Sequence, residues 1–272
     1  MKINLYDENG INKSPLSGHK FNPKQVEWII KQNNFDGITI FTDKHIVKNT
    51  AATVKSKIKI ALLLEPKIVY AQMYSAILKH EKLYNYILTH DAKLITSGKK
   101  YIFTPANGTW IPMDRHQIYP KTKLVSSVVS KKNMFPGHKI RHEMCNIIKS
   151  IDYYGSKFSW IPTKDIGMKD YMFSVAIENS SVPNYFTEKI LDCFLCGCVP
   201  VYWGCTNIEK FFNPRGIIKF QNAAELKTKI LPKLSKQKYK EMRSAVQENF
   251  ETAKKYAIHT DWIYDNILIG VK

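Results

Sequence analysis

The sequence predicts an α/β protein with two domains, each built around a parallel β-sheet. Three observations lead to this fold class. Short apolar segments that suit buried strands alternate with segments that suit helices. One irregular stretch with an Asn-Gly turn and two prolines, 107–123, divides this series in two. The length of 272 residues is enough for two compact domains of ordinary size.

The first predicted domain covers residues 1–118 and contains the apolar segments of the first series. These strand-like segments lie at 36–41, 57–64, 84–89 and 99–104. Between the second and the third lies "YAQMYSAILKHEKL", which suits a helix. The segment "QVEWIIKQ" (25–32) is also expected to be helical. Because parallel strands are joined through helices, this alternation predicts a parallel sheet.

The second predicted domain covers residues 119–272 and shows the same alternation. Its strand-like segments lie at 123–130, 151–155, 171–177, 199–204 and 216–220. Its helical patterns lie at 137–151, after Thr187, and at 223–234, 236–256 and 261–269. We therefore expect a second parallel sheet, with two or three helices at the end of the chain.

Polar residues directly follow several of these strands, at the edge where parallel α/β sheets bind ligands. In the first domain these residues are Asp43, Glu65, His90 and Asp91. In the second domain they are Glu178, Asn179 and Ser180. If the two sheets face each other, all of these groups line one cleft.

The stretch "YFTEKILDCFLCGCVPVYWG" (185–204) holds three of the five cysteines. The spacing of Cys193, Cys196 and Cys198 allows a metal site, but a structural zinc needs four ligands. The same stretch has an apolar helical face, where a reduced cysteine packs as a small core residue. We therefore interpret these cysteines as core residues and expect no metal.

The charged start of this predicted helix is a candidate anion site. Thr187 suits the N-cap position, which leaves Glu188 and Lys189 in the first turn. The free N–H groups and the dipole of a helix N-terminus favour phosphate, and Lys189 adds a full charge. A capped helix with a solvated Glu-Lys pair explains the same spacing, so the pattern alone leaves both interpretations open.

The chain is strongly basic, with a net charge of +18, yet only four of its 41 basic residues are arginine. Nucleic-acid readers usually rely on arginine, so we attribute the lysine excess mainly to compositional bias and expect no nucleic-acid partner. Basic clefts also attract acidic ligands such as nucleotide diphosphates. Arg141 falls in the first turns of the helix after the turn at 136–137, where a doubly wound domain holds phosphates. A surface arginine is the alternative, and the rarity of arginine favours the functional role.

Several signals are absent from the sequence. There is no G-x-x-x-x-G-K-[ST] and no G-x-G-x-x-G, so neither a P-loop nor a dinucleotide site is expected. There is no Asp-x-Asp pair for a carboxylate-held metal ion, so a bound diphosphate must be neutralised by Lys, Arg and helix ends. No stretch approaches 18 uncharged apolar residues, and "MKINLYDENGINK" lacks an apolar signal-peptide core. We therefore expect a soluble, cytoplasmic protein without a transmembrane segment.

The segment "FSVAIENSSVPNYFTEKILDCFLCGCVPVYWG" (173–204) closely resembles the donor-binding signature of the α-1,3-fucosyltransferase family, above all its bacterial members. The shared pattern is Glu-Asn-Ser at 178–180, Tyr-x-Thr-Glu-Lys at 185–189, then Pro200 and Gly204. The resemblance continues through "FFNPRGIIKF" and is faint in the first domain. It implies a GT-B architecture, in which two Rossmann-like domains face a cleft, with the acceptor on the first and the donor on the second. It also implies an inverting, metal-independent transfer of fucose from GDP-fucose to a glycan hydroxyl, with no cofactor beyond this donor.

The resemblance further implies roles for individual residues. Glu65, in "IALLLEP", corresponds to the family's proposed catalytic base, and Glu188 is placed to stabilise the sugar carbon or to hold the sugar. "LVSSVVSKKN…HKIRHE" is similar to the family's segment with a phosphate-binding arginine, which implies that role for Arg141. The implied donor-binding residues are Arg141, Asn179, Tyr185, Lys189, Glu178, Ser180 and Thr187. Asp43, His90 and Asp91 are acceptor-side candidates by their positions after strands.

Three other functions fit parts of the sequence. The nearest is the same fold with another nucleotide sugar, such as UDP-xylose. A basic nucleic-acid-binding protein is more distant, and so is a sugar-binding scaffold without catalysis. The acceptor, the linkage and the oligomeric state are not specified by any motif.

Overall fold

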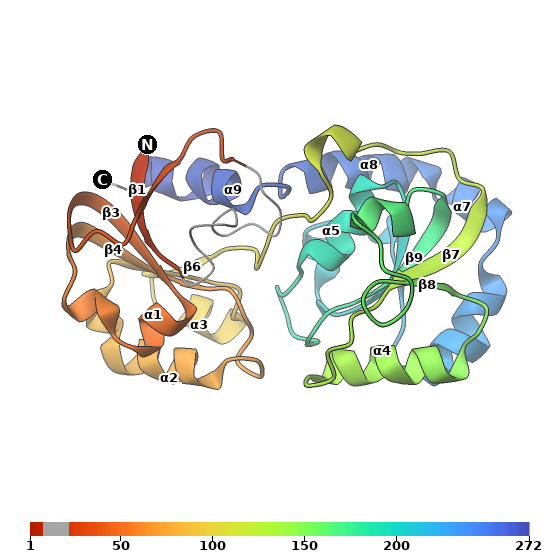
Figure 1. Ribbon diagram of the computed structural model, residues 1–272, viewed down its shortest axis with the longest axis horizontal. Helices are drawn as coiled ribbons and strands as arrows, with labels where there is room; N and C mark the ends of the chain where they lie inside the picture. Colours follow the sequence, from red (N-terminus) through yellow and green to blue (C-terminus); the bar gives the residue numbers. More distant parts are fainter. Residues whose placement is uncertain (8–21, 272) are drawn as a thin grey trace. The chain divides into compact units, whose positions relative to one another are not determined.

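The computed structural model describes residues 1–7 and 22–271 and shows two compact α/β units (Figure 1). The first unit comprises Met1–Gly108, Pro183–Tyr185 and Ile258–Lys272, and the second comprises Thr109–Val182 and Phe186–Ala257. Each unit contains one parallel sheet, so the predicted fold class is confirmed.

The division into units differs from the predicted boundaries, 1–118 and 119–272. The chain enters the second unit already at Thr109, and its last residues return to the first unit. Helix α9 (His259–Asn266) explains the return, because its Ile263 is buried in an apolar cluster with residues of the first sheet. Because of this burial, α9 belongs to the first unit although it comes last in the sequence.

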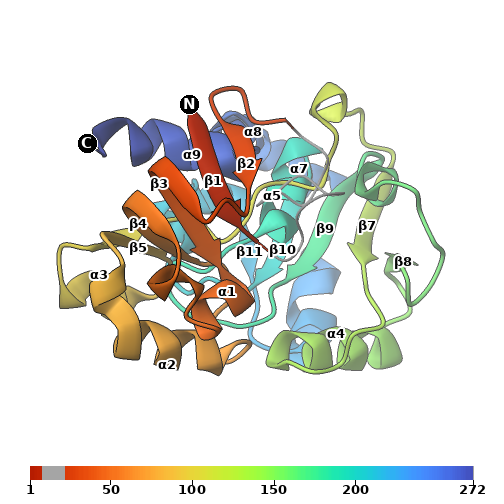
Figure 2. The ribbon, with the colours of Figure 1, turned by 60° about the vertical axis from the view of Figure 1, so that its left-hand side comes forward.

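Within the described residues, the sheet of the first unit has six strands, and all neighbouring pairs are parallel. The strands are β1 (Lys2–Tyr6), β2 (Glu27–Ile30), β3 (Asn34–Thr42), β4 (Lys55–Leu63), β5 (Tyr86–Thr89) and β6 (Tyr101–Phe103). Their spatial order is β2-β1-β3-β4-β5-β6, which Figure 2 shows for β2 to β5. The direction of travel across the sheet reverses between β1 and β3, so the topological switch point of this sheet lies there.

Helices cover both faces of the first sheet. They are α1 (Asp43–Val47), α2 (Ala71–His80) and α3 (Ala92–Ser97) on one face and α9 on the other (Figure 1). Strand β4 shows how the sequence produces two buried faces. Its Ile60 and Leu62 belong to the apolar cluster that includes α9, whereas Ala61 and Leu63 belong to the cluster that includes α1 and α2. Successive side chains of a strand point to opposite faces, so a continuous apolar run is buried on both.

The helix predicted for 25–32 is wrong, because strand β2 lies there and pairs in parallel with β1. Val26, Trp28 and Ile30 all pack in the cluster that includes α9. They are spaced by two, which is the strand period, whereas a helical face needs a spacing of three and four. Strand β1 was not predicted either, although its residues from Ile3 onward are buried.

The sheet of the second unit has five strands, again with all neighbouring pairs parallel. They are β7 (Lys123–Val128), β8 (Asp152–Tyr154), β9 (Tyr171–Ile177), β10 (Val199–Trp203) and β11 (Ile218–Lys219). Their order is β11-β10-β9-β7-β8. The helices are α4 (Pro136–Ile147), α5 (Glu188–Leu195), α6 (Ala223–Glu225), α7 (Lys236–Glu241) and α8 (Arg243–Lys254). The predicted strands of this unit are confirmed, and the helix predicted at 236–256 is divided at Met242 into α7 and α8.

Candidate active site in the second unit

The switch point of the second sheet lies between β7 and β9. From β7 the chain crosses through α4 to β8 on one side, and from β9 it crosses through α5 to β10 on the other side. Helices α4 and α5 therefore lie on opposite faces of the sheet (Figure 1). Both helices begin after the carboxyl ends of these two strands, so two positive helix N-termini meet at one edge.

The start of α4 contacts the end of β9 through Gly137. Its N–H donates to the carbonyl of Asn179 at 3.2 Å, and a Cβ at this position would lie only 1.7 Å from the carbonyl oxygen of Glu178. A glycine is thus required here by contact with backbone. His138 completes the start of the helix, since its Nδ1 accepts from the N–H groups of Met134 and Phe135 at 3.2 Å each. Burial lowers the pKa of His138 to about 4, with help from nearby cations including Arg141, so the ring is neutral at pH 7.

Arg141 lies in the second turn of α4 and is buried, so it is not the surface arginine that the sequence left open as the alternative. Its Nε and Nη2 donate to the carbonyl of Ile177 at 3.0 and 2.6 Å, and Nη2 also donates to Oδ1 of Asn179 at 3.1 Å. The guanidinium is therefore fixed against the last residue of β9. The structure brings together two predicted donor-binding residues, Arg141 and Asn179, and places Ser180 beside them as a buried residue.

The start of α5 is fixed by Thr187 and Glu178. Thr187 is extended and its side chain accepts from the N–H of Lys189, so the predicted N-cap is confirmed. Thr187 also donates its own N–H and hydroxyl to the two carboxylate oxygens of Glu178, at 2.9 and 2.6 Å. Glu178 has an exposed fraction of 0%. Both oxygens of its carboxylate already accept hydrogen bonds from Thr187. Its predicted role in donor binding would therefore be to position Thr187 and Lys189.

Lys189 is shared between two carboxylates. Its Nζ lies 3.0 Å from Oε1 of Glu188 and 3.4 Å from Oε2 of Glu178, and it donates to the Thr187 hydroxyl at 3.0 Å. Burial lowers the pKa of Lys189, but the two carboxylates outweigh burial and raise it. Burial also raises the pKa of Glu188, but Lys189 and Lys164 together lower it to about 2. Burial raises the pKa of Glu178 against the opposing charge of Lys189.

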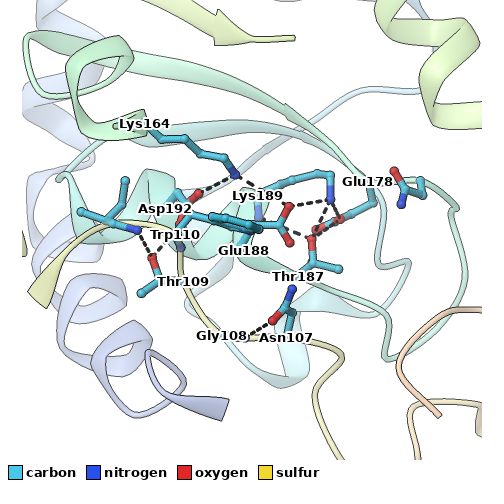
Figure 3. Close-up of polar contacts among 12 residues, drawn as sticks. Asn107, Gly108, Thr109, Trp110, Lys164, Glu178, Thr187, Glu188, Lys189 and Asp192 are labelled. Carbon is cyan, nitrogen blue, oxygen red and sulfur yellow. Dashed lines mark hydrogen bonds and ion pairs between the residues drawn. The ribbon is translucent and has the colours of Figure 1, made fainter. Parts of the chain in front are cut away.

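A second lysine, which sequence reasoning missed, also reaches Glu188. Lys164 precedes β9 in a short 3-10 turn (Lys164–Gly167), and its Nζ lies 3.7 Å from Oε1 of Glu188 and 2.9 Å from Oδ2 of Asp192. Figure 3 shows Lys164 and Lys189 reaching Glu188 from opposite sides. Glu188 and Asp192 are four residues apart on α5, so they lie on one face of the helix. Two carboxylates on one helix face favour a cation between them, and this spacing was the signal in the sequence for a second lysine or arginine at the site.

The three cysteines of the segment are buried, as predicted. Cys193, Cys196 and Cys198 each have an exposed fraction of 0%. The Cys198 thiol lies 3.1 Å from the carbonyl of Met168, and burial raises the pKa of all three thiols. Across residues 1–7 and 22–271, no group of three or more His, Cys, Asp and Glu side chains is arranged to hold a metal ion. In the same part of the chain, no helix has the length and apolar character needed to cross a membrane.

The remaining predicted residues lie in the first unit. Glu65 follows β4, and its backbone carbonyl accepts from the Tyr74 hydroxyl at 3.1 Å. Asp91 is the N-cap of α3 and accepts from two of its N–H groups, which gives it a structural role, and Asp43 is the first residue of α1. The ring of His90 lies 4.9 Å from that of Tyr185, and burial lowers the pKa of His90 to about 4.

Asp7 lies at the switch point of the first sheet and was not among the predicted site residues. Asp7 directly follows β1 and is buried. It accepts a hydrogen bond of 2.8 Å from the hydroxyl of Thr42 at the end of β3. The rule that selected residues after strands would have selected Asp7 if β1 had been recognised.

Comparison with known proteins finds a family model that covers most of the second unit. The family model "Glycosyltransferase family 10 (fucosyltransferase) C-term" matches residues 118–264. An α-(1,4)-fucosyltransferase of Arabidopsis thaliana is 34% identical over 76 residues, which cover 27% of this chain and 19% of that protein. The α-(1,3)-fucosyltransferase FucT of Helicobacter pylori is 33% identical over 58 residues, 21% of this chain and 12% of that protein. The chain thus spans less than a fifth of the length of these two relatives.

Solved structures extend the likeness over almost the whole chain. An α1,3-fucosyltransferase crystallised with GDP aligns with a TM-score of 0.57 and 15% identity, covering 94% of this chain and 89% of that one. One with GDP-fucose aligns with a TM-score of 0.56 and 14% identity, covering 94% and 90%. At this identity the likeness shows the fold, and it confirms the predicted GT-B-type class. The resemblance noted in 173–204 lies within the matched family region.

Proposed function

The chain belongs to glycosyltransferase family 10, and on this premise we propose that it transfers fucose from GDP-fucose to a glycan hydroxyl, with inversion and without a metal ion. One observation carries the proposal. The N-termini of α4 and α5, with Arg141 and Lys189 beside them, meet at the switch point of the second sheet. This arrangement supplies cationic groups for a diphosphate. The choice of donor is supported by a solved structure of this fold that holds GDP-fucose.

Arg141 and Lys189 are the proposed ligands of the diphosphate. Arg141 is held by Ile177 and Asn179, so little side-chain freedom remains to be lost when a phosphate binds. Lys189 is paired with Glu188 and Glu178 and must exchange part of this pairing for the phosphate oxygens. Both cations would then stabilise the negative charge that develops on the leaving nucleotide.

Glu188 is the proposed partner of the sugar. Its pKa of about 2 keeps the carboxylate ionised at neutral pH, and 12% of its side chain is exposed. An ionised carboxylate at this position would stabilise the oxocarbenium-like carbon that forms as the bond to the diphosphate breaks. Ser180 is proposed to complete the donor pocket, and Tyr185, which belongs to the first unit, stays a proposed donor-binding residue by its place in the shared motif.

Glu65 is the proposed general base. It follows a central strand of the first sheet, at the carboxyl edge where ligands of parallel sheets bind. It would take the proton from the acceptor hydroxyl as the oxygen attacks the anomeric carbon. Asp91 is a weaker candidate for this step because its carboxylate caps α3.

A thermal-shift panel with GDP, GDP-fucose, UDP and UDP-xylose tests the donor, because a ligand that binds the folded protein raises its melting temperature. We expect GDP and GDP-fucose to give the largest shifts. Release of GDP in the presence of a glycan panel then tests transfer, and the anomeric configuration of the product by NMR tests inversion. A larger shift with UDP-xylose would assign the site to another donor. Salt-sensitive DNA binding without any nucleotide shift would support the nucleic-acid alternative.

A further inference from the structure

Lys164 is held at the site by a contact that does not involve Lys189. Its Nζ donates to Oδ2 of Asp192 at 2.9 Å, and Asp192 has an exposed fraction of 0%. The other oxygen of Asp192 accepts from the Thr109 hydroxyl at 2.5 Å and from the N–H of Trp110 at 2.8 Å. Both carboxylate oxygens are therefore occupied, and Asp192 gives Lys164 a fixed anchor.

The anchored ammonium group faces Glu188. Nζ of Lys164 lies 3.7 Å from Oε1 of Glu188, and its side chain is 27% exposed. The Nζ of Lys164 also lies over the ring of Trp110, 5.6 Å from its centroid. Glu188 thus has two cationic neighbours, Lys189 at 3.0 Å and Lys164 at 3.7 Å, which are held by different acidic groups.

A bound donor would change the ion pairs of Lys189 but not the ion pair of Lys164 with Asp192. A diphosphate competes with Glu188 and Glu178 for Lys189, so its arrival weakens the nearer cationic contact of Glu188. Lys164 has its own partner in Asp192 and keeps its position. On the basis of the function proposed above, we propose that Lys164 is a positioning residue that holds the Glu188 carboxylate in place once Lys189 has turned to the diphosphate.

Removing the charge of Lys164 tests this role. Among the described residues, the ionisable groups near Glu188 are Lys189 and Asp192 on its own helix, Glu178 at the end of β9 and Lys164 before β9, with Arg141 of α4 acting on Lys189. In Lys164→Gln, the pKa of Glu188 should rise, and the rise should be larger with GDP bound than without it. A cation at this distance shifts a carboxyl pKa by about 1–3 units, so we expect a rise of about one unit or more with GDP.

The measurement is the ¹³C NMR titration of the glutamate carboxyl groups, with and without saturating GDP, and Glu188→Gln assigns the resonance. Lys164→Arg keeps the charge and should titrate as the wild type does. Lys219→Gln is the matched control, because it removes a lysine whose Nζ lies 2.7 Å from Glu209 in an exposed pair. It should leave the Glu188 resonance unchanged.

The outcomes separate this inference from the proposed function. Where GDP binds, an unchanged Glu188 pKa in the GDP-bound Lys164→Gln variant, or a rise equal to that in its free form, would overturn the role of Lys164. Absence of any GDP binding would overturn the proposed function, and the titration of the free protein would still show whether Lys164 acts on Glu188. If Lys164→Gln does not fold, Lys164→Met removes the same charge and should give the same GDP-dependent rise. No rise in that variant would contradict the inference.

Discussion

A methyl group at Gly137 tests how α4 is held against the end of β9. The added Cβ would lie 1.7 Å from the carbonyl oxygen of Glu178 and 2.8 Å from its carbonyl carbon. Real Cβ atoms essentially never approach a neighbour within 3.0 Å, so the gap must open by at least 1.3 Å, the difference between 3.0 and 1.7 Å. The neighbour is backbone at the end of a buried strand, so it cannot turn aside as a flexible side chain can.

The displacement has a cost in stability and a cost in function. Overpacking of this kind costs about 1–3 kcal/mol, and each kcal/mol lowers the melting temperature by about 2–4 °C in a chain of this size. Arg141 is carried by the same helix and bonds to Ile177 and Asn179, so the shift also moves the proposed phosphate contact. A misplacement of about 1 Å can reduce turnover about 100-fold.

Calorimetry and GDP release measure the two effects of Gly137→Ala. Gly270→Ala is the matched control, because a Cβ there would meet nothing within 4 Å and the residue is exposed. We expect the control to stay within about 0.5 kcal/mol of the wild type. If Gly137→Ala melts and turns over as the wild type does, α4 does not depend on this close contact and the described site is wrong in its central geometry.

Three further predictions address individual side chains. The pKa of Glu188 is lowered from 4.5 to about 2, and this shift stabilises the fold by about 3 kcal/mol above pH 4.5. The stabilisation is lost as the pH falls toward 2, so the difference in urea stability between the wild type and Glu188→Gln should shrink between pH 4.5 and 2. A difference that does not change with pH would refute the ion pairing. Glu65→Gln should lower kcat by about 10²–10⁴ with little change in GDP affinity, and near wild-type turnover would place the base elsewhere. Cys196→Ala should cost about 1 kcal/mol or more in urea unfolding, and stoichiometric zinc in the purified protein would contradict the core role.

The sequence predicted the second sheet and the first turn of α5 because both depend on local patterns. Strands β7 to β11 are short apolar segments, and Thr187 caps its helix through a neighbour only two residues away. Strand β2 was missed for a different reason. The segment at 25–32 contains apolar residues at several spacings, and only pairing with β1 shows that the spacing of two decides the structure.

The parts of the site that could not be predicted depend on contacts between distant residues. Lys164 meets Asp192 across 28 positions, and no pattern in the sequence specifies that contact. Glu178 was correctly located after a strand, but its full burial under Thr187 follows only from the packing of α5 against β9. The return of α9 to the first unit likewise depends on which apolar face is left uncovered.

Titration calorimetry with GDP in EDTA shows whether the second unit binds a guanosine diphosphate through its cationic side chains, as we propose. We expect binding that Mn²⁺ does not strengthen and weaker binding of UDP. Lys189→Met should lower the affinity about 10- to 100-fold, the cost of a hydrogen bond to a charged group. Binding that disappears in EDTA and returns with Mn²⁺, or an unchanged affinity in Lys189→Met, would contradict this proposal.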